Sequence, residues 1–163
     1  MRFRGVRLAG IAATSLLAAP ISAHQRAAAE AQEATLAQSA RGPAAIVDAF
    51  HSALRRGDTA AAAAMLANDA LIFEEGGAER SKAEYVAKHL PADAAFSKAV
   101  RSQVTRRAGH SDGTLAWIAT EGRISGAFKG KPVERTTTET MVLRRMGSTW
   151  RIVHIHWSSA AAH

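Results

Sequence analysis

The spacing of apolar side chains divides the chain into a helical first part and a second part made of strands. After Gly42-Pro43, apolar residues recur every three or four positions, at Ile46, Val47, Phe50, Ala53 and Leu54. This period predicts a helix that begins at the proline and ends at Gly57. A second, Ala-rich helix is predicted to start at Asp58 or Thr59 and to end at Asn68-Asp69.

A short strand and a third helix are predicted next. Leu71-Ile72-Phe73 is a short apolar run before Gly76-Gly77, which is typical of a strand leading into a turn. Ser81 and Glu84 have the spacing of a capping box, so a helix is expected from there to about Leu90. We expect Pro91 to end it and an irregular segment with Asp93 and Phe96 to follow.

The rest of the chain alternates runs rich in Val, Thr, Ile and Trp with turn residues. The turns are predicted at Asp112-Gly113, within 126–132 and at Gly147-Ser148. Four consecutive antiparallel strands are therefore expected at roughly 98–109, 114–125, 132–145 and 149–158. Helices first and strands afterwards indicate an α+β domain, with the helices packed on one face of a curved sheet.

The N-terminus has the pattern of a secretory signal peptide. Three arginines within the first seven residues precede an uncharged apolar stretch at 8–21, which ends at Ile21-Ser22-Ala23. This stretch is too short for a membrane-spanning helix. A transit peptide or an uncleaved anchor is the alternative. The predicted organisation is a signal peptide at 1–23, an Ala/Gln-rich flexible arm at 24–42, a domain at 43–158 and a tail at 159–163.

The composition narrows the classes of partner. Without the three N-terminal arginines the net charge falls from +7 to +4, and the remaining arginines form scattered pairs without interleaved aromatic residues. We therefore expect no nucleic-acid partner, and no membrane contact after signal cleavage. The absence of cysteine excludes disulfides and thiolate metal sites. The predicted protein is exported, to the periplasm.

The last predicted strand carries two histidines. Strict alternation places Trp150, Ile152, His154 and His156 on one face, and Arg151, Val153, Ile155 and Trp157 on the other. Two imidazoles that point the same way can ligate a metal, transfer protons or hold an anion. The alternative is a pair of structural histidines bonded to the backbone or to hydroxyl groups.

The C-terminal segment resembles a known family. Thr138-Glu-Thr-Met-Val-Leu-Arg-Arg, then Gly147, then Trp150-Arg-Ile-Val-His-Ile-His-Trp-Ser resembles the SnoaL-like branch of the NTF2-like superfamily. The segment from Ile46-Val-Asp-Ala-Phe to Arg55-Arg-Gly-Asp, with Ala70-Leu-Ile-Phe beyond it, is also similar, so the resemblance covers about 43–158. It implies three N-terminal helices held as a cone in a strongly curved, mainly antiparallel sheet, with a pocket between them and frequent dimerisation through the sheet.

The superfamily includes isomerases, cyclases, dehydratases and non-catalytic binding or assembly modules, so the resemblance implies no single activity. A cone would bring the third helix, with Tyr85 and His89 on one face, toward the last strand. The expected ligand pocket is lined by His89, Tyr85, Phe73, Trp117, Trp150, His154 and His156. Three of these, His89, His154 and His156, are the candidate ligands of a zinc or copper ion. No other cofactor is indicated.

Acid-base chemistry is the alternative use of such a pocket. The catalytic candidates are His154, His156, Glu139 and Tyr85, and two further glutamates, Glu74 and Glu121, are also considered. A glutamate inside an apolar cone has a raised pKa, which suits proton abstraction next to a carbonyl. An exposed cross-strand charge pair is the ordinary alternative for Glu139. No residue matches the catalytic aspartate and tyrosine of ketosteroid isomerases, so their reaction is not carried over.

Three functions are compatible with these patterns. The first is an exported domain that binds a small molecule in a pocket with a histidine-rich polar end. The second is a zinc- or copper-binding periplasmic protein that uses the same histidines. The third is a non-catalytic assembly module that forms a homodimer through the outer face of the sheet. The sequence leaves open whether the protein is an enzyme.

Overall fold

The computed structural model describes residues 36–162, which form one α+β unit. The predicted signal peptide and most of the predicted arm lie outside the described residues. The helical elements are η1 (Gln38–Ala40), α2 (Arg41–Arg56), α3 (Thr59–Met65), α4 (Lys82–Lys88) and α5 (Leu90–Ala99). The strands are β1 (Leu66–Glu74), β2 (Gly77–Glu79), β3 (Val100–Ser111), β4 (Leu115–Phe128), β5 (Lys131–Met146) and β6 (Thr149–Ala161). None of the described helices is long and apolar enough to cross a membrane.

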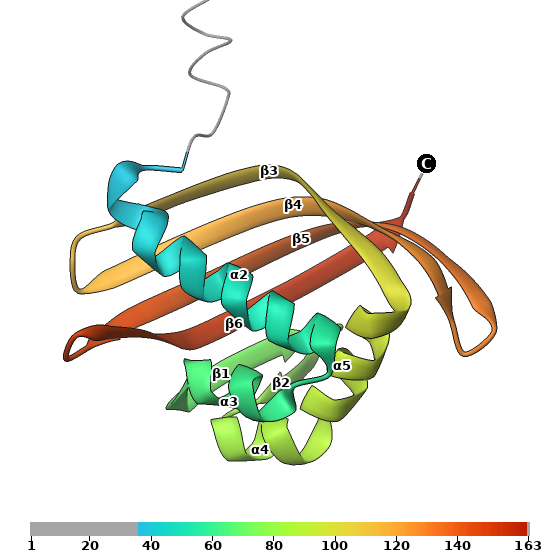
Figure 1. Cartoon of the computed structure of the whole chain (residues 1–163), viewed down its shortest axis with the longest axis horizontal. Helices are drawn as coiled ribbons and strands as arrows, with labels where there is room; N and C mark the ends of the chain where they lie inside the picture. The colour runs from blue at the N-terminus through green and yellow to red at the C-terminus, as the bar shows by residue number, and fades with distance from the viewer. Residues whose placement is uncertain (1–35, 163) are drawn as a thin grey trace, which may run out of the picture. The chain divides into compact units, whose positions relative to one another are not determined.

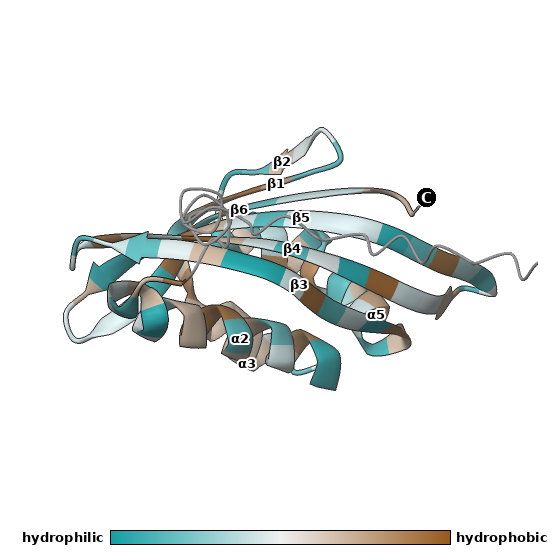
Figure 2. Ribbon diagram, turned by 90° about the horizontal axis from the view of Figure 1, so that it is seen from above, coloured by the Kyte–Doolittle hydropathy of each residue, from teal (hydrophilic) through white to brown (hydrophobic). Residues whose placement is uncertain are grey.

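One six-stranded sheet runs through the domain in the order β2-β1-β6-β5-β4-β3. All neighbouring strands are antiparallel except β1 and β6, which are parallel. The long strands β3 to β6 curve, and α2 crosses them (Figure 1). In the view turned by 90°, α2, α3 and α5 lie on the same side of the sheet (Figure 2). The predicted fold, helices on one face of a curved and mainly antiparallel sheet, is confirmed.

The core lies between α2 and the inner face of the sheet. The predicted apolar stripe of α2 is buried, with Val47 and Phe50 fully covered, and Gly57 ends the helix in a left-handed conformation at φ 72°. The opposing sheet residues are fully buried as well: Ile118, Met141, Leu143, Ile152 and Ile155. Removal of this apolar surface from water is the main force that holds the helix on the sheet.

The structure corrects three predicted elements. The segment after Pro91 was expected to be irregular but forms α5, because a proline in the first helical turn lacks only an amide that would be unpaired there. The second helix ends at Met65, and β1 already starts at Leu66, before the expected stop at Asn68-Asp69. The turn expected at Gly76-Gly77 lies at Glu75-Gly76, and Gly77 already belongs to the short β2, which pairs with β1.

A β-bulge in β6 reverses the side-chain alternation that the sequence suggests. Val142 and Leu143 are consecutive on β5, but their partners on β6 are His154 and Ile152, which leaves Val153 as an extra residue. Ile152 and Ile155 are therefore both fully buried although three positions separate them. The prediction that the two histidines of β6 share a face with Ile152 is wrong, because the bulge lies between them.

Candidate functional site

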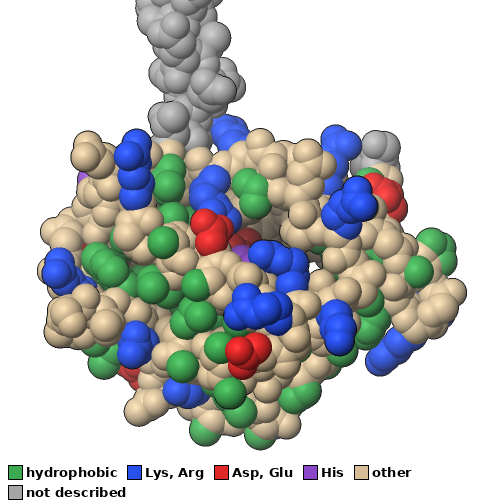
Figure 3. All heavy atoms as spheres, in the orientation of Figure 1, with side chains coloured by type: hydrophobic (Ala, Val, Ile, Leu, Met, Phe, Trp, Pro, Cys, Tyr) green, Lys and Arg blue, Asp and Glu red, His purple; other side chains and the backbone are tan. Residues whose placement is uncertain are grey.

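A cavity of about 810 Å³ lies between the helices and the inner face of the sheet. Its walls come from α2, α5, the β1–β2 turn region and the inner residues of β3 to β6. In the space-filling view, the face that carries α2 is hollowed, and lysine and arginine side chains surround the hollow (Figure 3). The sheet curvature and the helical cover thus leave room for a small molecule beside the core.

Five lining residues stand in one row across the sheet. The backbone register pairs Glu74 with Trp157, Trp157 with Glu139, Glu139 with Thr120, and Thr120 with Arg107. All five line the cavity. Since neighbouring strands lie about 4.8 Å apart, the backbones of Glu74 and Glu139 are separated by about 10 Å. Two carboxyl groups therefore face the same space from strands on either side of β6.

Glu139 is a buried carboxylate, with 8% of its surface exposed. Its Oε2 accepts a hydrogen bond from Trp157 Nε1 at 2.6 Å and lies 2.7 Å from His51 Nε2, whereas Oε1 has no partner within residues 36–162. Burial works to raise the pKa of Glu139, but His51, the Trp157 hydrogen bond and Arg107 together hold it below its ordinary value. The group is thus kept ionised, as an acceptor inside the cavity.

Arg107 fixes the geometry around this carboxylate. Its Nη1 lies 2.6 Å from Asp48 Oδ1 on α2, and its Nε donates to Thr120 Oγ1 at 3.2 Å. The Arg107 side chain is largely buried, with 16% exposed. These contacts tie α2 to β3 and β4 beside the cavity and leave the Arg107 charge compensated by Asp48.

Glu74 has a different environment at the end of β1. It is half-buried in the cavity wall. Burial raises its pKa to about 7, helped by the negative charges of Asp93 and Glu75. A carboxyl group with this pKa is present in both protonation states near neutral pH, so it can accept and return a proton under those conditions.

Tyr85 and Asp93 form a hydrogen-bonded pair, and the Asp93 charge acts on Glu74. The Tyr85 hydroxyl donates to Asp93 Oδ2 at 2.7 Å, and Tyr85 itself is fully buried. Burial raises the pKa of Asp93, although the Tyr85 hydrogen bond lowers it in part. Burial, then the Asp93 charge, raises the pKa of Tyr85, so Tyr85 stays a neutral donor. Asp93 lines the cavity. Tyr85 does not line it, but its hydroxyl holds the Asp93 carboxylate in place.

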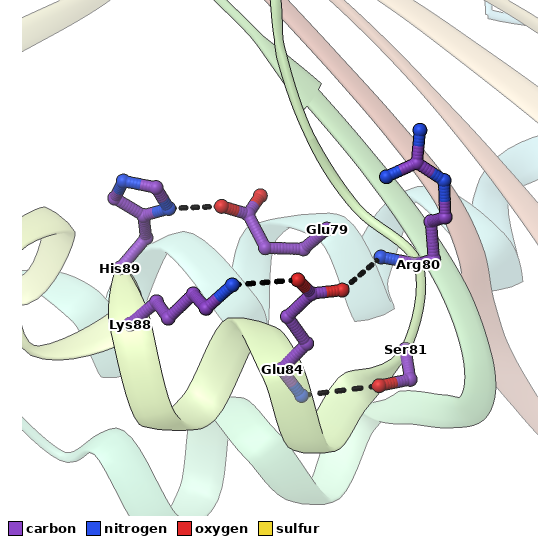
Figure 4. A network of polar contacts seen from close by, with 6 residues as sticks. All are labelled: Glu79, Arg80, Ser81, Glu84, Lys88 and His89. Atoms are coloured by element: carbon purple, nitrogen blue, oxygen red, sulfur yellow. Dashed lines mark hydrogen bonds and ion pairs between the residues drawn. The ribbon is translucent and has the colours of Figure 1, made fainter.

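The predicted helix start at Ser81 places His89 at the rim of the cavity. The Ser81 hydroxyl accepts from the Glu84 amide at 3.1 Å, and Glu84 accepts in turn from the Arg80 amide at 2.8 Å, so the N-terminus of α4 is capped (Figure 4). At the other end of this helix, His89 Nδ1 contacts the carboxylate of Glu79, which is 5% exposed. Both His89 and Glu79 line the cavity.

The comparisons with known proteins agree with this architecture. A model of the SnoaL-like domain family matches residues 44–162. The chain belongs to the SnoaL-like family. The comparison of this SnoaL-like domain with curated proteins found no match.

Solved structures with a similar fold come from proteins of different kinds. A putative ketosteroid isomerase from Shewanella frigidimarina NCIMB 400 is 34% identical over 69% of this chain and 91% of that chain, with a TM-score of 0.67. A putative calcium/calmodulin-dependent protein kinase II association domain from Xanthomonas campestris is 21% identical over 78% and 94%, with a TM-score of 0.65. An NTF2-like protein of unknown function from Pseudomonas putida KT2440 is 20% identical over 76% and 89%, with a TM-score of 0.63.

The two histidines of β6 lie on the outer face of the sheet in this SnoaL-like domain. His154 Nδ1 lies 2.9 Å from the Leu71 carbonyl oxygen, and since a carbonyl can only accept, Nδ1 carries the proton. The Phe73 ring packs edge-on against both imidazoles, at centroid distances of 5.3 Å from His154 and 6.2 Å from His156. These are the contacts of structural histidines.

Several residues expected in the pocket are therefore elsewhere. The walls of the cavity do not include six of the seven expected residues: Tyr85, Phe73, Trp117, Trp150, His154 and His156. Trp117 is 44% exposed on the outer sheet face, where it lines a second hollow, and Trp150 packs against the core. The bulge in β6 explains the positions of His154 and His156, because it turns over the part of the strand that follows it.

The three imidazoles proposed as metal ligands do not come together. His89 lines the cavity, whereas His154 and His156 lie on the opposite face of β6. Within the part of the chain that the structure describes, no three His, Asp or Glu side chains are grouped as a metal site. The expected zinc or copper site of His89, His154 and His156 is therefore not formed.

Of the other predicted site residues, Glu139 and His89 line the cavity, and Glu121 does not. Glu121 is exposed and lies 3.7 Å from Arg106 in a surface ion pair. Neither His51 nor the role of Trp157 in the site was predicted from the sequence. The signal for His51 was weak: it follows Phe50 directly and so lies at the edge of the apolar stripe of its helix.

Proposed function

We propose that this SnoaL-like domain binds a small molecule in the cavity and moves a proton on it, with Glu74 as the group that takes up and returns the proton. The observation that carries the proposal is the position of Glu74 in the cavity wall, with its pKa raised to about 7. A general base is most effective when its pKa lies near the working pH. The similarity to a putative ketosteroid isomerase supports a ketone as the substrate.

The proposed reaction is an isomerisation through an enolate. The Glu74 carboxylate removes a proton from a carbon next to the carbonyl, the electrons of the C–H bond form the enolate, and the protonated Glu74 returns the proton to another carbon. Negative charge grows on the carbonyl oxygen. When protonated, His51 can donate to that oxygen through its second ring nitrogen, because Glu139 already holds Nε2 at 2.7 Å.

A β,γ-unsaturated ketosteroid tests this proposal, because its isomerisation produces a conjugated enone with a strong ultraviolet absorbance. We expect turnover by the wild-type protein and a loss of about 100-fold or more in Glu74→Gln, which keeps the shape but not the base. Glu121→Gln is the matched control, since Glu121 is exposed outside the cavity. Full activity of a folded Glu74→Gln variant would overturn the role of Glu74.

Assembly through the outer sheet face is a second candidate function. This face exposes apolar side chains of β1 and β4: Phe73 is 37%, Leu115 46% and Trp117 44% exposed. Such a patch is typical of a surface that another molecule covers. The structural likeness to an association domain supports a homodimer formed in this way, and it is compatible with a ligand in the cavity.

Export to the periplasm is also a proposal, which rests on the basic and apolar N-terminal segment alone. N-terminal sequencing of protein from the periplasmic fraction tests it. We expect the mature chain to begin after Ala23, and an intact Met1 would contradict cleavage.

A further inference from the structure

The charged side chains that line the cavity without an ion-pair partner stand on different elements. Three lining acids are each paired with a base, as described above. The lining acids without a basic partner in the described chain are Glu74, Glu75 and Asp93, at the end of β1 and on α5. Two lining arginines, Arg55 on α2 and Arg135 on β5, form no ion pair with another described residue. The unpaired acids and the unpaired arginines therefore lie on different elements of the cavity wall.

Arg135 lies on the inner face of the sheet among hydroxyl groups. On β5 it is four residues from Glu139, so both side chains leave the strand on the same side. Its register partners are Ile124 and Ala161, and neither carries a charge. Three further residues with hydroxyl groups line the same part of the cavity: Ser102, Thr137 and Ser159.

This arrangement has the chemistry of an anion-binding subsite. A guanidinium group presents several N–H donors in one plane, which matches the oxygens of a carboxylate or a phosphate. Serine and threonine hydroxyls can each donate one more hydrogen bond to such a group. The acidic neighbour in sequence, Glu134, is an exposed residue on the opposite side of the strand and does not line the cavity.

We propose that Arg135, with the hydroxyls of Ser102, Thr137 and Ser159, binds an anionic oxygen group of the substrate, a carboxylate or a phosphate. This inference deepens the proposed function, because it adds a charge to the small molecule on which Glu74 acts. It names the class of substrate as an anionic carbonyl compound and makes Arg135 the residue that selects it.

The separation of charges also fixes the orientation of such a substrate. Arg135 is about 13 Å along β5 from the row that contains Glu139, and Glu74 is two strands farther across. An anionic group is repelled by Glu74, Glu75 and Asp93 and attracted by Arg135. The charged end of the substrate therefore lies away from Glu74, and its neutral carbonyl end reaches the proton-transfer group.

Binding of matched probes tests the subsite without any turnover. We would titrate 2-naphthol, 6-hydroxy-2-naphthoate and 2-naphthyl phosphate into the folded protein by calorimetry at low salt. The first two compounds differ only by the carboxylate, and the third distinguishes phosphate from carboxylate. Because Arg135 is exposed and keeps part of its hydration, we expect an anionic probe to bind about tenfold more tightly than 2-naphthol.

The variants assign that preference to one residue. Arg135→Gln should remove the preference and leave the affinity for 2-naphthol unchanged, and Arg135→Lys should keep part of it. Arg101→Gln is the matched control, because Arg101 is an exposed arginine between two lining residues of β3 and does not line the cavity. It should behave like the wild type.

Two results would overturn the inference. The first is an equal affinity for the neutral and the anionic probes, or no binding of any of the three. The second is a preference for the anionic probes that survives in Arg135→Gln. The Glu74→Gln variant separates this inference from the proposed function. It should retain the preference for anionic probes even though it loses turnover, and full turnover by Glu74→Gln would refute the base without affecting the subsite.

Discussion

The indole Nε1 of Trp157 donates a 2.6 Å hydrogen bond to the buried carboxylate of Glu139 on the neighbouring strand. The same Glu139 oxygen lies 2.7 Å from His51 Nε2, so one acceptor joins β5, β6 and α2. Trp157 also stands between Glu139 and Glu74 in the register of the sheet. The indole thus separates an ionised carboxylate from one whose pKa is near neutral.

Replacement of this indole should destabilise the protein. Trp157→Phe keeps an aromatic ring that can stack on Phe50, at a centroid distance of 6.4 Å in the wild type, but it removes the donor. We expect a loss of about 1–3 kcal/mol in the free energy of unfolding, because Glu139 loses a hydrogen bond in a buried site. Urea unfolding measures it. Trp117→Phe, at an exposed ring, should change stability by less than about 0.5 kcal/mol, and equal effects of the two would contradict this account.

The Glu139 pKa predicts how stability responds to acid. Its folded pKa is depressed, so its contribution to stability is present above its unfolded pKa of about 4.3 and is lost as the pH falls through the folded value. Urea unfolding between about pH 7 and pH 3 should therefore show a decline for the wild type that is smaller in Glu139→Gln. Parallel curves for the two proteins would show that Glu139 is not held ionised.

Glu74 should have the opposite effect on stability. Its folded pKa of about 7 lies above its unfolded value, so its contribution is present in acid and is lost as the pH rises through 7. Glu74→Gln should therefore be more stable than the wild type at about pH 8, by roughly 1–2 kcal/mol after a discount for the solvent that screens a half-exposed group. The gain should vanish near pH 3, well below the unfolded pKa of about 4.3, where Glu74 is neutral in both states.

The same pKa predicts the pH profile of turnover. Because the proposed base must be ionised, kcat/KM for the ketosteroid should rise with pH and level off above about 7. A profile that levels off near pH 4 would assign the base to a carboxyl group with an unshifted pKa.

Assembly through the outer sheet face predicts that one charge can separate the subunits. Light scattering should give the mass of a dimer for the wild type and of a monomer for Trp117→Glu, since a buried carboxylate without a partner is costly. Val86→Glu is the control, because Val86 is an exposed apolar residue of α4. A wild-type monomer, or a dimer that persists in Trp117→Glu, would exclude this surface as the interface.

Much of the fold could be predicted from local patterns, and the exceptions have physical causes. The apolar stripe from Val47 to Leu54 and the turns at Gly113 and Gly147 are local signals, and the helix and hairpins form where they were expected. Pro91 was misread because proline both ends helices and begins them. The residues after a proline decide whether a helix ends or begins there, and after Pro91 they form α5.

The site was harder to predict than the fold. Glu139 and His89 were identified, but His51 meets Glu139 only after α2 has packed across the sheet. The bulge at Val153 left no mark in the sequence, since Val, Ile and His fit either face of a strand. Glu74 was one glutamate among several until burial in the folded domain, helped by the charge of Asp93 from another element, raised its pKa.

The extra residue in β6 divides the strand into two parts whose side chains alternate independently. Before it, Ile152 completes the core; beyond it, Trp157 lines the cavity, and His154 and His156 lie on the outer face of the sheet. Substitutions of the two histidines should therefore alter the outer face of the sheet without changing a side chain that lines the cavity.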